Sequence, residues 1–259
     1  MKKIKAKPET KETSRLYKVA RWLLWFFYRD YRVEGAENLP DGAALIVGNH
    51  SQMHGPIACE FYFPSNHHTW CAGQMMKLKD VPAYAYADFW SQKPPFSRPF
   101  YKLLSYLIAP LAVLVFNNAN TIPVYRDNRI AVTLKKTLRK LAEGAHVIVF
   151  PEQDGETNGI LYEFQSGFVD VGRLYHKRFD KELPFVPLYI APNRKTMYIG
   201  KATQFNPNAP IEAERERICA YLTEEITAMA KQLPLHTVVP YRNVPKRLYP
   251  TNKPKEDVK

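Results

Sequence analysis

The chain has 259 residues, of which 46% are hydrophobic and 24% charged, proportions that exclude collagen, a coiled coil or disorder over the whole length. Its three cysteines are widely spaced, which argues against a disulfide framework or a thiolate zinc site and is most simply explained by a reducing compartment. No uninterrupted run of 18 apolar residues is present, so a standard membrane-spanning helix is not expected.

The formal net charge of +12 is concentrated at the two ends of the chain. Residues 1–22 hold eight Lys and Arg against two acidic residues, and residues 241–259 hold six against two. Nucleic-acid-binding proteins usually spread their basic residues over a folded face, so basic ends on a nearly neutral body favour an anionic membrane surface over nucleic acid as the partner. Solvated, disordered tails are the alternative explanation.

Three segments are expected along the chain, beginning with a basic tail and a membrane-docking helix over residues 1–30. Residues 1–14 are polar and expected to be flexible, whereas residues 16–28 combine Trp, Phe and Tyr with flanking Lys and Arg. This pattern is typical of an amphipathic helix in the membrane interface, although a helix packed on the core of the body has the same signature. The main domain is expected over residues 31–240, followed by a basic C-terminal tail over residues 241–259.

The body alternates short apolar runs with amphipathic stretches. Buried strands are predicted at 43–47, 121–125, 146–150, 184–190 and 197–200, and helices at 130–144 and 211–233. This alternation predicts an α/β fold with a mostly parallel central sheet flanked by helices on both faces. Residues 57–100 give no clear prediction. Residues 103–116 are apolar but are expected to be split by Pro110, and form either buried core or a lipid-facing patch.

Polar clusters follow three of the predicted strands, where the chemistry of an open α/β sheet is usually found. They contain Asn49, His50 and His54 in the first, Arg126 in the second, and Glu152, Gln153 and Asp154 in a Pro/Gly/Asp-rich loop after the third. A His, an Arg and a Glu on one rim suit a general base, an anion holder and a polar organiser. A metal site from His50, His54, His67 and His68 would lack a third ligand of known geometry, so no metal is expected.

The order of these motifs resembles the glycerophosphate and lysophospholipid acyltransferase family, which includes the 1-acylglycerol-3-phosphate acyltransferases. Asn49, His50 and Pro56 match the N-H-x4-D block and the Pro that usually follows it, and Arg126 matches the Arg that ends the second block. The third block, F-P-E-G-T, matches at 150–152, and the apolar strand containing Pro of the fourth block resembles residues 185–190. The resemblance covers residues 35–200 and departs from the family at two places. Gly55 stands where the family has Asp, and Gln153-Asp154 stand where it has Gly-Thr.

The resemblance implies acyl transfer from a thioester, on acyl-CoA or acyl carrier protein as co-substrate, to a hydroxyl of a lipid, with no other cofactor. His50 would be the general base, and Asn49, His54, Arg126, Gln153 and Asp154 would contact substrates. Because Gly55 cannot orient the imidazole, another group is expected to do so. Glu152, Asp154 and His54 are the possible replacements, and Glu152 is the one we expect.

Two other functions fit the same residues: a lipid-binding protein that kept the fold and lost activity, and a hydrolase of acyl thioesters or lysolipids in which His50 activates water. The expected location in all three cases is the cytoplasmic side of the cell membrane, as a peripheral or monotopic protein.

Overall fold

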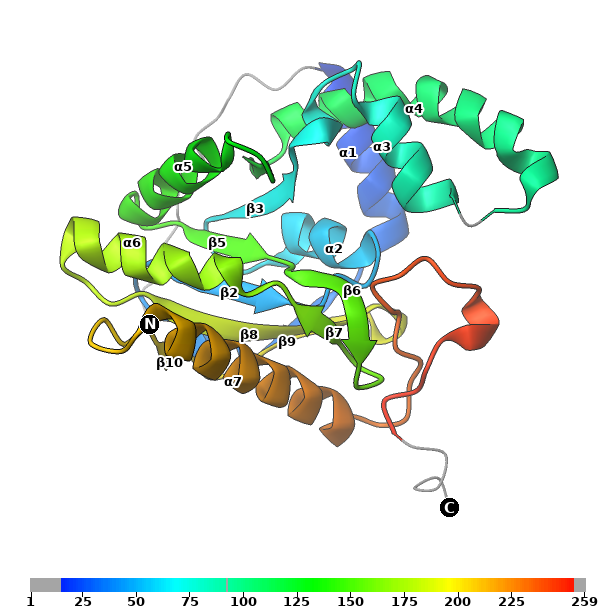
Figure 1. The fold of residues 1–259 in the computed structure, drawn as a ribbon. Helices are drawn as coiled ribbons and strands as arrows, with labels where there is room; N and C mark the ends of the chain where they lie inside the picture. Colours follow the sequence, from blue (N-terminus) through cyan, green and yellow to red (C-terminus); the bar gives the residue numbers. More distant parts are fainter. Residues whose placement is uncertain (1–14, 92, 254–259) are drawn as a thin grey trace.

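The computed structural model describes residues 15–91 and 93–253. The expected flexible segment 1–14 lies outside the described residues, and so does the end of the basic tail, 254–259. Figure 1 shows a twisted central sheet with three helices, α5, α6 and α7, across its near face and α2 behind it. Helices α3 and α4 lie together at one side of this body.

The central sheet runs in the order β1-β9-β8-β2-β5-β3-β4, with β10 paired to β8. Strands β8, β2, β5, β3 and β4 are parallel, whereas β9 and β10 are antiparallel to β8. The predicted mostly parallel sheet is therefore confirmed. The strands are β1 (Arg32–Glu34), β2 (Leu45–Gly48), β3 (His67–Ala72), β4 (Thr121–Val124), β5 (His146–Val149), β6 (Glu152–Thr157), β7 (Tyr162–Phe164), β8 (Pro184–Ala191), β9 (Thr196–Ile199) and β10 (Thr203–Gln204).

Helices cover both faces of this sheet, as the alternating pattern predicted. In the described part of the chain the α-helices are α1 (Arg15–Tyr28), α2 (His54–Tyr62), α3 (Val81–Ala85), α4 (Arg98–Asn118), α5 (Ile130–Ala142), α6 (Asp170–Phe179) and α7 (Ile211–Gln232). Side chains of β2 alternate between two buried clusters: Leu45 and Val47 pack with residues of α5, α6 and α7, whereas Ile46 packs with residues of α2. Burial on both faces explains why the strand is apolar throughout instead of alternating.

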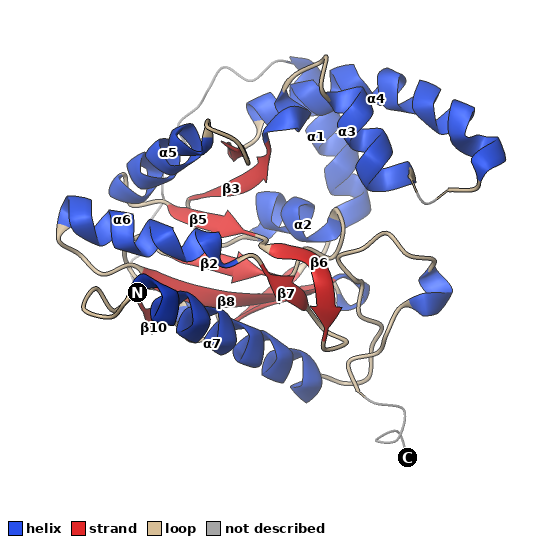
Figure 2. Cartoon of the chain, viewed as in Figure 1, coloured by secondary structure: helices blue, strands red, loops and turns tan. Residues whose placement is uncertain are grey.

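Two elements differ from their predictions. Helix α4 continues through the exposed Pro110 for 21 residues, and the turn before it is held by the buried Ser105 and Ala109. The loop expected after residue 150 is the hairpin β6–β7, which Figure 2 shows projecting at the end of the sheet. It carries the third polar cluster on a paired strand, so the positions of these side chains are fixed by the hairpin.

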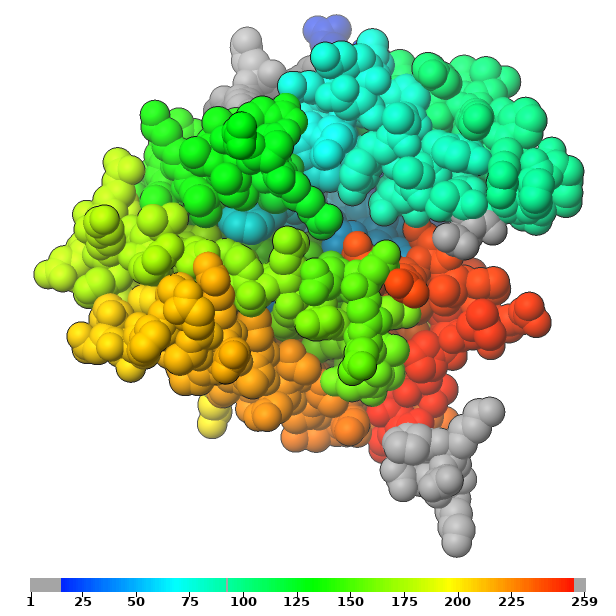
Figure 3. All heavy atoms as spheres, in the orientation of Figure 1, coloured from blue at the N-terminus to red at the C-terminus, as the bar shows by residue number. Residues whose placement is uncertain are grey.

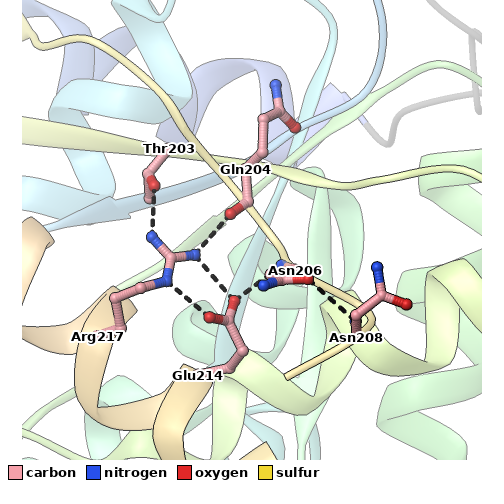
Figure 4. A network of polar contacts seen from close by, with 6 residues as sticks. All are labelled: Thr203, Gln204, Asn206, Asn208, Glu214 and Arg217. Carbon is pink, nitrogen blue, oxygen red and sulfur yellow. Dashed lines mark hydrogen bonds and ion pairs between the residues drawn. The ribbon is translucent and has the colours of Figure 1, made fainter. Parts of the chain in front are cut away.

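The start of α7 is held by a polar network (Figure 4). The network includes β10, which pairs with the start of β8, at the opposite end of this strand from the end of β2. Glu214 is buried and accepts hydrogen bonds from the Asn206 backbone N–H at 2.8 Å and from Arg217 at 2.6 and 2.8 Å. Arg217 also donates to the Gln204 carbonyl and to the Thr203 hydroxyl, which fixes β10 against α7. Its polar groups are bonded to one another, so we assign this network to the fold and not to a site.

Two buried histidines at the amino ends of β3 and β5 predict that acid destabilises the fold. His67 and His146 are paired across β3 and β5, and the His67 Nε2 and His146 Nδ1 atoms have no hydrogen-bond partner within the described chain. Burial and, to a smaller extent, the charge of the neighbouring His67 together lower the pKa of His146 to about 4. The unfolded chain therefore binds more protons than the folded one between about pH 6.5 and 4, so stability falls as the pH decreases through this range.

We expect His146→Gln to remove part of this pH dependence, worth up to about 3 kcal/mol at the acid end. Urea midpoints measured between pH 4 and 7 for both proteins test the prediction. Parallel pH curves for the wild type and the variant would contradict it.

Candidate active site

The three polar clusters meet at one rim of the sheet, because the strands that precede them are parallel. His50 follows β2, Glu152 begins the hairpin after the adjacent strand β5, and Arg126 follows β4. Strand β4 is three positions from β2, which separates the His50 and Arg126 loops by about 15 Å at the usual strand spacing. Figure 3 shows a hollow between the α3–α4 region and the hairpin with the C-terminal segment, with early parts of the chain visible at its floor.

The imidazole of His50 is oriented by a backbone carbonyl. Its Nδ1 contacts the carbonyl oxygen of Gln52, which can only accept, so Nδ1 carries the proton of the neutral ring. The Nε2 atom is then the acceptor, which is the state a general base requires. The ring lies edge-on to Phe150 and Tyr241, with centroid distances of 5.3 and 5.8 Å. Burial lowers the pKa of His50 from its ordinary value, and the Gln52 carbonyl partly opposes this shift.

A left-handed turn places this carbonyl. Ser51 and Gln52 have φ angles of 47° and 55°, a conformation that costs about 1–2 kcal/mol for a residue other than glycine. Hydrogen bonds hold the turn: the Ser51 hydroxyl accepts from Asn49 at 2.7 Å, and the Gln52 amide donates to the Tyr249 hydroxyl at 2.8 Å. Two adjacent strained residues beside a half-buried imidazole point to a functional requirement for this geometry.

The expected contact between Glu152 and the imidazole is not made. The Glu152 carboxylate is buried and accepts from two backbone N–H groups, of His50 at 2.7 Å and of Tyr162 at 2.8 Å. Glu152 therefore joins the hairpin to the chain at His50 and does not bind the ring. Burial raises the pKa of Glu152 to about 7, although both N–H donors favour its ionised form.

Position 55 has no room for the carboxylate of the family. A Cβ atom on Gly55, in the first turn of α2, would lie 2.6 Å from the His50 carbonyl oxygen and 2.9 Å from that of Asn49. Such distances are well inside van der Waals contact. The tight turn therefore selects glycine here, and the same turn supplies the Gln52 carbonyl that contacts the imidazole.

Asn49 and His54 are both bonded to other parts of the protein. The buried Asn49 amide donates to the Ile190 carbonyl at 2.9 Å, and its oxygen accepts from the Ile190 N–H at 2.6 Å, which ties the end of β2 to β8. His54 begins α2 and is not stacked beside His50, as a helical turn would have placed it. Its Nδ1 lies 2.8 Å from the Tyr28 hydroxyl, so it connects α2 to α1.

Arg126 is the exposed guanidinium of the rim. In the described residues it forms no hydrogen bond or ion pair, whereas the nearby Arg129 is bonded to Asp127 at 2.6 Å and lies 4.2 Å from the Tyr125 ring centroid. Its charge is close enough to oppose the raised pKa of Tyr241, which burial and then the charges of Asp88 and Asp154 increase. Arg126 is thus an exposed cation of this loop with no partner among the described residues.

The C-terminal segment, residues 240–252, completes the rim, although a basic tail was expected over residues 241–259. Arg242 forms an ion pair with the exposed Asp154 at 2.6 Å, so Asp154 holds this segment on the hairpin. Gln153, the residue before Asp154, is half-buried. Tyr241 covers the His50 ring, and Tyr249 accepts from Gln52. The expected basic tail is, as far as residue 253, part of the folded body. Its aromatic residues, Tyr241 and Tyr249, were the available signal.

No group of three or more His, Cys, Asp or Glu side chains in the described chain is arranged to hold a metal ion. His67 and His68 are at the amino end of β3, whereas His50 follows the carboxyl end of the parallel strand β2, so they lie at opposite ends of the strands.

No family model matches the sequence, and no curated protein matches it significantly. Among solved structures, the chain is similar to the crystal structure of the 1-acyl-sn-glycerophosphate (LPA) acyltransferase PlsC from Thermotoga maritima, with 16% sequence identity and a TM-score of 0.47. The likeness covers 85% of this chain and 80% of that one. At this level it supports no conclusion about activity, which rests on the rim residues.

Proposed function

We propose that the protein is an acyltransferase that moves an acyl group from a thioester to a hydroxyl of a lysophospholipid, glycerophosphate or related lipid at the membrane surface. The observation that supports it most is the His50 imidazole, whose Nδ1–H is held by the Gln52 carbonyl, so that Nε2 is the proton acceptor of the neutral ring. The ordered resemblance of the motifs around His50, Arg126 and Glu152 agrees with this chemistry.

In the proposed reaction His50 Nε2 takes the proton of the acceptor hydroxyl as its oxygen attacks the thioester carbonyl. The tetrahedral intermediate then expels the thiolate as the C–S bond breaks, and the imidazolium returns the proton to the sulfur. The lowered pKa of His50 keeps the ring neutral, and so able to accept a proton, at neutral pH. Arg126 is proposed to bind a phosphate of the acceptor, because a guanidinium binds phosphate oxygens in a bidentate manner.

The proposed membrane contact is a pair of apolar helices. Among the described residues, the helical stretch Pro95–Asn118, which consists of a short 3-10 turn and α4, is long and apolar enough to cross a membrane. A spanning helix was not expected, because the sequence has no uninterrupted run of 18 apolar residues. Only 11% of the most apolar part of Pro95–Asn118 is buried, unlike a core helix. Helix α1 packs against α4 and also exposes apolar side chains, which on the two helices include Trp22, Phe27, Phe100, Leu103 and Leu107.

We propose that α1 and α4 lie in the membrane surface without crossing it. The inner side of α4, with Ser105 and Ala109, is buried against α3 and its neighbours, so α4 remains part of the folded body. Lys18, Arg21, Arg98 and Lys102 are exposed on the same helices and suit anionic head groups. The free thiols of Cys59, Cys71 and Cys219 are consistent with the cytoplasmic side.

Vesicle binding tests this contact. The double variant Phe100→Glu/Leu107→Glu should weaken binding to vesicles with anionic lipid by about tenfold or more, because each change removes an apolar side chain worth about 1.5–3 kcal/mol when buried. Binding of the wild type should also fall as salt rises. Val132→Glu, at an exposed apolar residue of α5, is the matched control and should bind normally. Unchanged sedimentation of the double variant with vesicles would contradict the assignment.

Arg126→Lys should raise KM for a phosphorylated acceptor about tenfold while leaving the urea midpoint unchanged, because lysine keeps the charge but cannot form the bidentate contact. An acceptor without phosphate should show no such change. An equal rise in KM for both acceptors would assign Arg126 a structural role.

The proposal as a whole is tested by measuring thiol release from acyl-CoA and from acyl carrier protein, with and without lipid acceptors. An acyltransferase releases thiol only with an acceptor, a hydrolase releases it without one, and a lipid-binding protein releases none.

A further inference from the structure

The turn that orients His50 is attached to the C-terminal segment. The Gln52 side-chain amide donates to the Tyr249 hydroxyl at 2.8 Å and to the Arg242 carbonyl at 3.3 Å, across almost 200 residues of sequence. The main chain of the same residue supplies the carbonyl that contacts His50 Nδ1. Gln52 alone therefore links Tyr249 to the carbonyl that accepts the imidazole proton.

The C-terminal segment is itself anchored on both sides of Tyr249. The Tyr249 N–H donates to the Lys246 carbonyl, which closes a short 3-10 turn. Three residues later the buried Asn252 side chain donates to the carbonyls of Ala230 and Leu233 and accepts from the His236 N–H. These bonds join the segment to the end of α7, so Tyr249 is held by a well-packed part of the fold.

The same segment holds the ring from a second side. Tyr241 lies edge-on to the imidazole at 5.8 Å and to Tyr162 of the hairpin at 6.0 Å, and the next residue, Arg242, is paired with Asp154. Phe150 and Tyr241 thus confine the imidazole, and the Gln52 carbonyl fixes the direction in which its Nδ1–H points.

We infer that Gln52 and Tyr249 are positioning residues for His50, and that the Gln52 carbonyl, held in place by the C-terminal segment, replaces the carboxylate that position 55 cannot hold. A carboxylate would fix the tautomer by accepting from Nδ1–H and would stabilise the imidazolium by its charge. The Gln52 carbonyl fixes the tautomer in the same way, by accepting from Nδ1–H. It stabilises the imidazolium through its dipole instead of a full charge. The inference deepens the proposed function and rests on it for its catalytic consequence, whereas the ring orientation stands on geometry alone.

Nitrogen NMR of the histidine side chains in the full-length protein tests the inference, because it identifies which ring nitrogen carries the proton. Wild-type His50 should be the Nδ1–H tautomer above its pKa. Tyr249→Phe removes the hydroxyl that Gln52 binds and should give a mixture of the two tautomers. Its kcat should fall about tenfold, the loss expected for one hydrogen bond, with little change in KM.

Tyr221→Phe is the matched control. It also removes one hydroxyl bond, to the Lys201 carbonyl at 2.9 Å, but lies on α7 away from the rim, and should leave the tautomer and kcat unchanged. Gln52→Met, which keeps the side-chain length without the amide, should reproduce the effect of Tyr249→Phe, and urea midpoints would identify a variant that fails to fold.

A pure Nδ1–H signal in both folded variants would overturn the inference and leave the proposed function intact. A tautomer mixture in an otherwise inactive protein would support the positioning role and reject the acyltransferase. Equal effects of Tyr221→Phe and Tyr249→Phe would also overturn it.

Discussion

His50→Ala is expected to lower kcat for acyl transfer by about 10²- to 10⁴-fold, the usual contribution of a general base. The acceptor hydroxyl would then have to lose its proton to water, which is a much weaker base. KM for the acyl thioester should change little, because a general base acts on the acceptor hydroxyl. The measurement is steady-state ester formation by the purified protein in lipid vesicles.

Chemical rescue makes this prediction specific. The alanine variant leaves a space between Phe150 and Tyr241 where free imidazole can bind, so added imidazole should restore part of the rate. His176→Ala, on α6, is the control for loss of an imidazole elsewhere and should keep its activity. The rate should decline with acid only below the ordinary histidine pKa of about 6.5, because burial lowers the pKa of His50. Full activity of His50→Ala would reject the catalytic assignment.

Gly55→Asp is expected to destabilise the protein by about 1–3 kcal/mol, the usual cost of overpacking, and to lower turnover about tenfold or more. The new Cβ would lie 2.6 Å from the His50 carbonyl oxygen, so the turn and the imidazole would have to move. Restoring the residue of the family motif should therefore impair the protein instead of activating it.

Gly42→Asp is the matched control, because a Cβ at Gly42 meets no atom within 4 Å and the residue has no positive φ. It should unfold at nearly the wild-type urea concentration and retain turnover. A rise in turnover of Gly55→Asp by orders of magnitude would show that the Gln52 carbonyl does not replace a carboxylate.

The strands of the sheet were predictable because the parallel strands are buried on both faces. Continuous apolar runs at residues 45–48, 146–149 and 184–191 carry that signal directly. Strand β3, with the sequence HHTWCA, was missed since it has no apolar run, and α2 was missed because Gly55 and Pro56 resemble a turn. Proline predicted a break at residue 110, but tertiary packing of α4 through Ser105 and Ala109 outweighs the local cost of the proline.

The site was predictable only as far as side chains at strand ends. His50 and Arg126 could be placed on one rim, because the carboxyl ends of parallel strands meet there. The Gln52 carbonyl could not be found, since every residue carries a backbone carbonyl and its direction depends on a left-handed turn. Tyr249 reaches the turn through tertiary packing, so no local pattern links it to His50.

The central claim is that an acyl group passes from a thioester to a lipid hydroxyl, and product analysis in ¹⁸O-labelled water tests it most directly. Purified wild-type protein is incubated with acyl-CoA and vesicles containing a 1-acylglycerol 3-phosphate, and thiol, ester and free fatty acid are quantified by mass spectrometry. The account predicts equal amounts of thiol and new ester, with no ¹⁸O in the transferred acyl group. Fatty acid labelled with ¹⁸O in place of ester would contradict it in favour of a hydrolase, and no thiol with acyl-CoA or acyl carrier protein would contradict catalysis.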